Sequence, residues 1–541
     1  MRYIVKTNSL CFILLLSACF TLVLNISFWL SLNTVINSSG VDKALLMLSV
    51  AVFIFCFIAF CFLLLLWQPF LKLVSIFFII GTALSNYFYL KYNIYIDKVM
   101  LSNIFETEIG EAVSLITLDM LLWLFVAALL PALIIIFIKI ETNDSRIRSM
   151  IKRLGVITIL FIVCIFSVYP FYKEFAAISR NNRHLVKLIM PVNIINSIYK
   201  YAAESSNTFR PLEQIAQDAY ITHTRKKLFI LVLGETSRSQ NFSLNGYHKL
   251  TNPQLANLSN IISFKHMYSC GTATSVSVPC MFSNMTRTEY SSSVAHAREN
   301  ILDIIQKAGY RVLWRENDFG CKGVCKRIPT QKVKEYISKD APSFGGLYYD
   351  DHLLDNLDDF INDQETNTFI VLHTNGSHGP EYYNRYRPTL KHLFEPACKT
   401  NAIENYTEEE LINVYDNTIL QVDDLLAKTI QLLEHYSEKY EVAMLYVSDH
   451  GESLGEKGVY LHSAPYAIAP QEQKHIPMIF WSADDYYENK TVSKNCLINK
   501  AEHNNFSHDY LFNSLLSALE IKTEIYNKEL DIFTGCELLD N

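Results

Sequence analysis

The chain has 541 residues, of which 50% are apolar and 19% are charged, and its formal net charge at pH 7 is −7. This length allows three or four ordinary domains. The modest negative charge, without a basic stripe, argues against a nucleic-acid-binding protein. The apolar content and the mean hydropathy of +0.14 argue against a purely soluble protein. We therefore expect membrane-spanning segments.

Five apolar runs precede residue 175, and each is about long enough to cross a bilayer, which needs ~20 residues. They are Ser9–Leu32, Ala44–Trp67, Phe70–Leu90, Leu115–Ile138 and Leu154–Tyr172. The first run is too long for a signal peptide and has no clear cleavage site, so we interpret it as a span. Basic residues cluster between the fourth and fifth runs and also precede the first. The positive-inside rule then predicts a cytoplasmic N-terminus and an external position for everything after about residue 172.

The twelve cysteines divide along the same boundary. Five lie in the apolar runs, where cysteine behaves as a small hydrophobe. The other seven begin at Cys270 and lie in a polar region, some at short spacings. This pattern is typical of disulfides in an oxidising compartment. The cysteines and the basic residues therefore both predict that the chain after about residue 172 lies outside the cytoplasm.

We expect three parts: a transmembrane domain at 1–172, a bridging helix and linker on the outer face of the membrane at 173–218, and an outer domain at 219–541. From about Ala219 the apolar runs alternate with helical patterns such as Glu408–Tyr436. This alternation predicts an α/β domain with a largely parallel sheet and helices on both faces.

Three polar residues between the third and fourth spans, Asn103, Thr107 and Glu111, are spaced four apart. A helix would place them on one face. A solvated amphipathic helix on the membrane explains this spacing as well as a functional site does.

Four predicted strands end in clusters of acidic, His, Asn and Gly residues. They lie in LFILVLGETSR (228–238), YRVLWREND (310–318), TFIVLHTNGSHGP (368–380) and VAMLYVSDHGES (442–453). The carboxyl ends of strands form the ligand-binding edge of an open α/β sheet. Glu235, His373, His378, Asp449 and His450 should therefore meet at this edge. Glu235, Asp449 and His450 offer the donors of a catalytic zinc site with three protein ligands. His373 has an equally good interpretation as a structural residue.

A hydroxyl-rich loop, CGTATSVSVPC, runs from Cys270 to Cys280 and opens into an apolar segment. A hydroxyl at a helix N-terminus gains from the helix dipole. A zinc ion would further lower its pKa and make it a nucleophile. Composition alone does not choose among Thr272, Thr274, Ser275 and Ser277, and a capping loop is the alternative interpretation.

The combined motifs resemble the bacterial lipid A phosphoethanolamine transferases, relatives of the mobile colistin-resistance enzymes. The motifs are GETSR, CGTATSVSVPCMFSNM, WRENDFGCKGVC, HTNGSHGP, NVYDNTI and YVSDHGESLGEKGVYLH. The resemblance covers the whole chain. It implies an alkaline phosphatase/sulfatase-like outer domain in the periplasm, held at the inner membrane of a Gram-negative bacterium by five spans. We expect a monomer.

The implied reaction transfers phosphoethanolamine from phosphatidylethanolamine to a phosphate of lipid A in lipopolysaccharide, through a phosphoethanolamine ester of Thr274. The modified lipid A would carry less negative charge, so polymyxins and other cationic peptides would bind it less well.

The resemblance also implies roles for individual residues. The implied zinc ligands are Glu235, Thr274, Asp449 and His450. Around the substrate phosphate, where the histidines can also bind a second zinc ion, the matching residues are His378, His462 and Lys322. The residues that match the donor-headgroup contacts are Asn103, Thr107 and Glu111.

Three disulfides are implied by the same resemblance: Cys270–Cys280, Cys321–Cys325 and Cys496–Cys536. Two further pairs that are common in the family cannot form here. Position 406 is Tyr, which leaves Cys398 without its usual partner, and the stretch SKDAPSFGGLYYDD has no cysteine.

Other functions also fit parts of this sequence. Relatives modify core sugars of lipopolysaccharide rather than lipid A. A sulfatase would need a Cys-x-Pro-x-Arg or Ser-x-Pro-x-Arg stretch at the nucleophile loop, and none is there, but a phosphodiesterase of the same fold is a rival. A membrane sensor with an inactive enzyme domain is a further alternative, against which the complete ligand set argues.

Overall fold

The computed structural model describes residues 5–36, 40–66, 70–101, 115–141, 145–206, 211–338, 341–342, 348–363, 365–490 and 492–537. The described residues form two compact units: residues 5–101 and 116–202 belong to the first, and residues 115 and 203–537 belong to the second. The expected boundaries at residues 172 and 218 stay predictions. Asn103, Thr107 and Glu111 lie outside the described residues.

The first unit is mainly helical. Its helices are α1 (Ser9–Cys19), η1 (Phe20–Leu24), α2 (Ile26–Val35), α3 (Gly40–Leu65), α4 (Leu71–Tyr92), α7 (Leu118–Leu124), η2 (Phe125–Leu129), α8 (Leu130–Phe137), α9 (Arg146–Val168), η3 (Tyr169–Phe171), α10 (Tyr172–Asn181), η4 (Arg183–Leu188) and α11 (Val192–Ser206). The short strands β1 (Val5–Asn8) and β2 (Ile138–Glu141) pair in parallel. Among the described residues, four helices are long and apolar enough to span a membrane, or five if one bent pair counts as a span. The predicted helical membrane domain is confirmed.

The first apolar run, which we interpret as a span, forms a bent pair of helices. Ser9–Leu24 and Ile26–Val35 meet at an angle of 54° around Asn25. The Asn25 amide nitrogen donates to the carbonyls of Phe20 and Met190, and its amide oxygen accepts from Met190 N at 2.7 Å. An Asn side chain that bonds the backbone in this way competes with the helix, which explains the bend.

The second unit is built on an eight-stranded sheet with the strand order β13–β5–β12–β9–β4–β8–β6–β7. In that order the strands are Phe506–Ser507, Ile262–Tyr268, His475–Ser482, Glu441–Ser448, Lys227–Gly234, Thr368–His373, Arg311–Glu316 and Thr330–Lys332. The strands from β9 to β7 are parallel, and β12 is antiparallel to both of its neighbours. The predicted largely parallel sheet is confirmed. The remaining short strands pair as β3 (Tyr220–Ile221) with β14 (Ile521–Lys522) and β10 (Ser453–Leu454) with β11 (Tyr460–Leu461).

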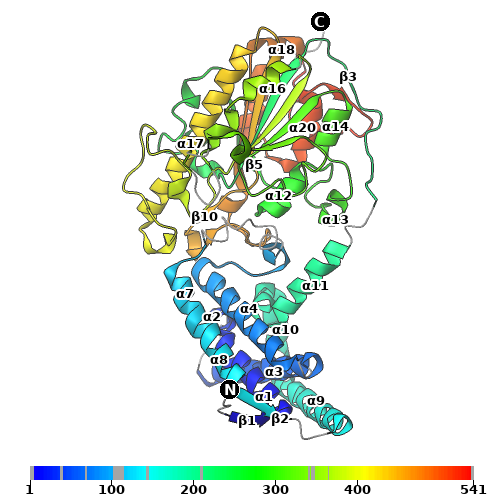
Figure 1. The fold of residues 1–541 in the computed structure, drawn as a ribbon, viewed down its shortest axis with the longest axis vertical. Helices are drawn as coiled ribbons and strands as arrows, with labels where there is room; N and C mark the ends of the chain where they lie inside the picture. Colours follow the sequence, from blue (N-terminus) through cyan, green and yellow to red (C-terminus); the bar gives the residue numbers. More distant parts are fainter. Residues whose placement is uncertain are drawn as a thin grey trace. The chain divides into compact units, whose positions relative to one another are not determined.

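Helices cover both faces of this sheet (Figure 1). The α-helices are α12 (Thr274–Met281), α13 (Ser292–Ala295), α14 (Ile301–Lys307), α15 (Val333–Tyr336), α16 (Leu357–Asp363), α17 (Glu408–His435), α18 (Asp484–Lys490), α19 (Lys494–His503) and α20 (Leu511–Ala518). Phe229, Leu231 and Leu233 of β4 belong to one core cluster with side chains of α14 and α20. Since successive strand residues point to opposite faces, the alternate β4 residues face the side on which α17 packs.

The second unit contains the three disulfides that the resemblance implied, Cys270–Cys280, Cys321–Cys325 and Cys496–Cys536. Cys398 is buried and forms no disulfide. The first disulfide flanks the start of α12, and the third closes a loop of 40 residues near the C-terminus.

Candidate active site

The carboxyl ends of neighbouring parallel strands bring the predicted site residues together. Glu235 directly follows β4, and Asp449 directly follows β9. The register pairs Gly234 with Ser448, so the next residues on the two strands are neighbours. Thr236 N accordingly donates to Asp449 Oδ1 at 3.1 Å. On the other side of β4, His373 ends β8 and pairs with Leu233.

Glu235, Asp449 and His450 form a compact, fully buried group of potential metal ligands. His450 Nε2 lies 3.4 Å from Glu235 Oε1 and 3.3 Å from Asp449 Oδ2. His450 Nδ1 lies 3.0 Å from Gly451 O, so Nδ1 carries the donated proton and Nε2 keeps its lone pair. Glu235 Oε2 and Asp449 Oδ2 have no hydrogen-bond partner within the described part of the chain. Buried acceptors without partners need an explanation, and a metal ion held by Asp449 Oδ2 supplies one for this atom.

The pKa values of these groups favour the same interpretation. Burial raises the pKa of Glu235 well above its usual range and that of Asp449 to about 7, and burial lowers the pKa of His450 to about 4. The two acids therefore tend to bind protons near neutral pH when no cation is bound. A divalent cation would replace these protons.

The position of Thr274 distinguishes it from two neighbouring hydroxyls. It is the first residue of α12, and its Oγ1 donates to Glu235 Oε1 at 3.2 Å and lies 3.3 Å from His450 Nε2. Thr272 Oγ1 instead donates to Ala464 O, and Ser277 Oγ donates to Asp449 O. These two hydroxyls hold the loop, whereas Thr274 faces the potential metal ligands.

The two histidines expected around the substrate phosphate also lie here. The ring centroid of His462 is 4.5 Å from that of His450 and 5.1 Å from that of His378. Burial lowers the pKa of His462 to about 4 and that of His378 well below its usual range, so both imidazoles are neutral at pH 7.

Glu452 is a site residue that the sequence analysis missed. It is fully buried, and its Oε2 lies 2.8 Å from His462 Nδ1 while its Oε1 accepts from the Tyr382 hydroxyl at 2.6 Å. Burial raises the pKa of Glu452 to about 8; the ionised carboxylate accepts a hydrogen bond from His462 Nδ1 and leaves Nε2 with a lone pair. The only sequence signal was an acid two residues beyond His450.

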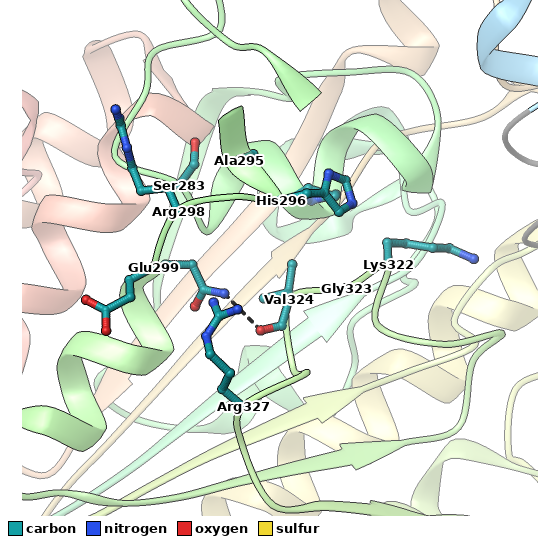
Figure 2. Close-up of a pocket in the computed structure, with 11 residues that line it drawn as sticks. Ser283, Ala295, His296, Arg298, Glu299, Lys322, Gly323, Val324 and Arg327 are labelled. Atoms are coloured by element: carbon teal, nitrogen blue, oxygen red, sulfur yellow. Dashed lines mark hydrogen bonds between the residues drawn. The ribbon is translucent and has the colours of Figure 1, made fainter. Parts of the chain in front are cut away.

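Lys322 follows Cys321 in the loop after β6, where its Nζ donates to Phe319 O at 3.1 Å. It also lines a small pocket with Pro279 of α12, Arg298 and Arg327 (Figure 2). The two arginines are already paired, Arg298 with Glu213 and Arg327 with Asp303. The Lys322 side chain points away from Arg327 in Figure 2. With room for about 20 Å³, this pocket holds little more than one water molecule and cannot take a lipid headgroup.

Two family models match the chain. Residues 54–206 match the family model for phosphoethanolamine transferase EptA/EptB, and residues 227–521 match the sulfatase model. Phosphoethanolamine transferase EptA of Escherichia coli K12 is 44% identical over 469 residues, which are 86% of this chain and 85% of that protein. Phosphatidylethanolamine transferase Mcr-1 of Escherichia coli is 35% identical over 76% of this chain and 78% of its own length.

A solved structure matches almost the whole chain. The integral membrane protein lipooligosaccharide phosphoethanolamine transferase A (EptA) from Neisseria meningitidis is 35% identical, with a TM-score of 0.94, and the match covers 98% of this chain and 99% of that one. The soluble domain of the same protein, solved alone, is 42% identical with a TM-score of 0.58 and covers 60% of this chain. The chain therefore belongs to the phosphoethanolamine transferase family, as an enzyme that joins a helical membrane domain to a sulfatase-like domain.

Proposed function

We propose that this enzyme transfers phosphoethanolamine from phosphatidylethanolamine to a phosphate of lipid A. The observation that carries the proposal is the position of Thr274 at the start of α12, with Oγ1 within 3.3 Å of both Glu235 and His450. The name of EptA, a phosphoethanolamine transferase, supports phosphoethanolamine as the transferred group. The name of Mcr-1, a phosphatidylethanolamine transferase, supports phosphatidylethanolamine as the donor.

The donor set fits zinc. Catalytic zinc sites typically have three protein ligands, from imidazole nitrogens and carboxylate oxygens among others, and one open coordination position. Glu235, Asp449 and His450 would hold the ion, with Thr274 Oγ1 as the fourth ligand. Bound zinc would supply positive charge for the phosphoryl group and lower the pKa of the Thr274 hydroxyl. A second zinc ion at His378 and His462 is a further part of the proposal.

In the first step Thr274 Oγ1 forms a bond to the donor phosphorus, and the bond from phosphorus to the diacylglycerol oxygen breaks. The Thr274 proton moves toward Glu235 Oε1, to which it is already donated. The diacylglycerol oxygen takes up a proton from water as it leaves, and Glu235 keeps the Thr274 proton for the second step. Thr274 then carries phosphoethanolamine as an ester.

In the second step an oxygen of a lipid A phosphate attacks the same phosphorus, and Thr274 Oγ1 leaves and regains a proton. His462 would support both steps by offering the Nε2 lone pair to a second cation, since Glu452 accepts the proton of Nδ1. Lys322 is proposed to contribute positive charge to the same group.

The product explains a biological role. Lipid A gains an amine, its net negative charge falls, and polymyxins bind it less strongly. We place the catalytic unit in the periplasm and the helical unit in the inner membrane of a Gram-negative bacterium. The apolar helices of the first unit support this placement. Asn103, Thr107 and Glu111 remain predicted contacts of the donor headgroup.

The test is mass spectrometry of lipid A from a polymyxin-sensitive host that expresses the wild type, Thr274→Ala or Thr274→Ser. We expect a gain of one phosphoethanolamine unit with the wild type, none with Thr274→Ala, and a reduced gain with Thr274→Ser, which keeps the hydroxyl. A gain with Thr274→Ala equal to that of the wild type would refute the nucleophile. Unchanged lipid A with the zinc-loaded wild type would instead indicate a core-sugar acceptor, and free phosphoethanolamine as the main product would indicate a hydrolase.

A further inference from the structure

A second group of potential metal ligands shares Glu235 with the proposed zinc site. Glu235, Asp318 and His373 are all buried, and each offers one ligand atom, with the three atoms within 4.8 Å of one another. The residues come from the carboxyl ends of β4, β6 and β8, which are adjacent strands. Neither Asp318 nor His373 takes part in the transfer mechanism proposed above.

The surroundings of His373 orient it as a ligand. Its Nδ1 lies 2.9 Å from Glu316 Oε1. Glu316 is held in turn by Trp314 Nε1, which donates to Oε2, and by Asp318 N, which donates to Oε1, both at 2.8 Å. The contact between His373 Nδ1 and Glu316 is close but lies outside hydrogen-bond geometry, so neither ring nitrogen has a hydrogen-bond partner among the described residues. With the proton on Nδ1, beside the Glu316 carboxylate, His373 would keep a lone pair on Nε2. A carboxylate behind a histidine in this way is the usual support of a metal-bound imidazole.

His373 Nε2 has no hydrogen-bond partner among the residues that the structure describes, although the side chain is completely buried. Asp318 Oδ2 is 3.9 Å away, which is too far for a hydrogen bond. Two ligand atoms bound tetrahedrally to one zinc ion, each at about 2.1 Å, lie about 3.4 Å apart. A small inward shift would therefore place one cation between these two atoms.

Asp318 is fixed on its other oxygen. Asn375 Nδ2 donates to Asp318 Oδ1 at 3.2 Å, which leaves Oδ2 for the cation. The Asn375 amide oxygen is also buried and has no partner in the described ranges. Glu235 Oε2 is unpartnered as well, so Glu235 has an oxygen beyond the one that accepts from Thr274.

The competing explanation is a proton on His373. Burial lowers the pKa of this imidazole, but Glu316, Asp318 and Glu235 together raise it to about 9 in the absence of any cation. A protonated ring would place an N–H on Nε2 at ion-pair distance from Asp318 Oδ2, 3.9 Å, which is too long for a hydrogen bond. Glu235, Glu316, Asp318 and Asp449 also bring four buried carboxylates to one place, and buried charge of one sign requires compensation.

We propose that Glu235, Asp318 and His373 form a second divalent-cation site, in which Glu235 bridges this cation and the one beside Thr274. One imidazole nitrogen with carboxylate oxygens suits zinc or manganese. The second cation would hold Glu235 in position and offset the buried negative charge. The inference rests on the proposed function only through Glu235, and the site is separate from the one proposed at His378 and His462.

The test is the metal content of the full-length protein in detergent. Bound metal is removed from the protein with a chelator, and the protein is dialysed against Zn²⁺ or Mn²⁺ in separate arms. The equivalents of metal bound per protein are then measured by elemental mass spectrometry. The variants are Asp318→Asn and His373→Gln, which keep the side-chain size, with Asp449→Asn and His378→Gln as matched controls at the other proposed sites. Thermal unfolding with and without metal provides a second readout.

We expect Asp318→Asn and His373→Gln each to bind one equivalent less than the wild type in at least one arm. The metal-dependent rise of the unfolding temperature should also become smaller. Wild-type metal content in both variants would overturn the proposal and favour the proton on His373. If only Asp449→Asn loses one equivalent of metal, the result would support the proposed zinc site and reject the second cation site. Loss in Asp318→Asn and His373→Gln but not in Asp449→Asn would support the second site and count against the proposed zinc site.

Discussion

Replacing Glu452 with Gln tests how His462 is positioned. Glu452 is fully buried and accepts from both His462 Nδ1 and the Tyr382 hydroxyl. Gln keeps one acceptor oxygen, so the amide oxygen can face His462 while its NH₂ group faces Tyr382. Burial raises the pKa of Glu452 to about 8, so Glu452 is ionised only above that pH. There the substitution turns a charge-assisted hydrogen bond to His462 into a neutral one, and the difference between these two classes is about 1–1.5 kcal/mol. This free energy corresponds to a fall in activity of about 5- to 12-fold.

The assay is phosphoethanolamine transfer from a fluorescent phosphatidylethanolamine to lipid A, together with the unfolding temperature. Tyr382→Phe is the matched control, because it removes the other partner of Glu452 and leaves the contact with His462 intact. We expect the control to lower the unfolding temperature but to keep activity within about twofold of the wild type. Equal loss of activity in both variants, or a Glu452→Gln enzyme as active as the wild type, would refute the positioning role.

Two further predictions concern pH and disulfides. Because burial raises the pKa of Asp449 to about 7 in the metal-free protein, protons compete with metal below that pH. Zinc affinity measured by calorimetry should therefore rise as the pH increases from 6 to 8. An affinity that does not change with pH would contradict this prediction. Replacing both cysteines of Cys496–Cys536 with Ser should lower the free energy of unfolding by about 4 kcal/mol, and the same change at Cys321–Cys325 should lower it by about 2 kcal/mol. The difference is expected because the first disulfide closes a loop of 40 residues and the second closes a loop of 4. Equal losses in denaturant unfolding would contradict the chain-entropy argument.

The sequence predicts the strands and the sheet edge well, because each strand is a short apolar run that ends in polar residues. The residues that follow β4 and β9, Glu235 and Asp449, could be assigned to one edge from this pattern alone. The strand order and register could not, since they depend on pairing between segments far apart in the sequence. Strand β4 pairs with β9, which begins more than 200 residues later.

The sequence pattern could not predict the roles of residues that depend on contacts with distant parts of the chain. Composition could not separate Thr274 from Thr272, because the acceptor of Thr272, Ala464 O, is 192 residues away. The bend at Asn25 likewise depends on Met190, 165 residues away. Glu452 looks like an ordinary turn acid until His462 is seen beside it. Local periodicity therefore predicts where donor residues gather, and tertiary contacts decide what each of them does.

Gly376 links this distant packing to the chemistry of the site. It has a φ of +52°, and a Cβ added there would lie 2.4 Å from the backbone oxygen of Glu235 and 3.0 Å from its nitrogen. Gly376→Ala should therefore displace Glu235 and weaken both zinc binding and transfer by more than about tenfold, beyond the ~1–2 kcal/mol cost of a left-handed alanine. Gly309→Ala separates the two effects, because Gly309 also has a positive φ but a Cβ there would meet nothing within 4 Å. Wild-type zinc affinity in folded Gly376→Ala, measured by competition with a chelating dye, would show that the close approach of this turn does not position Glu235.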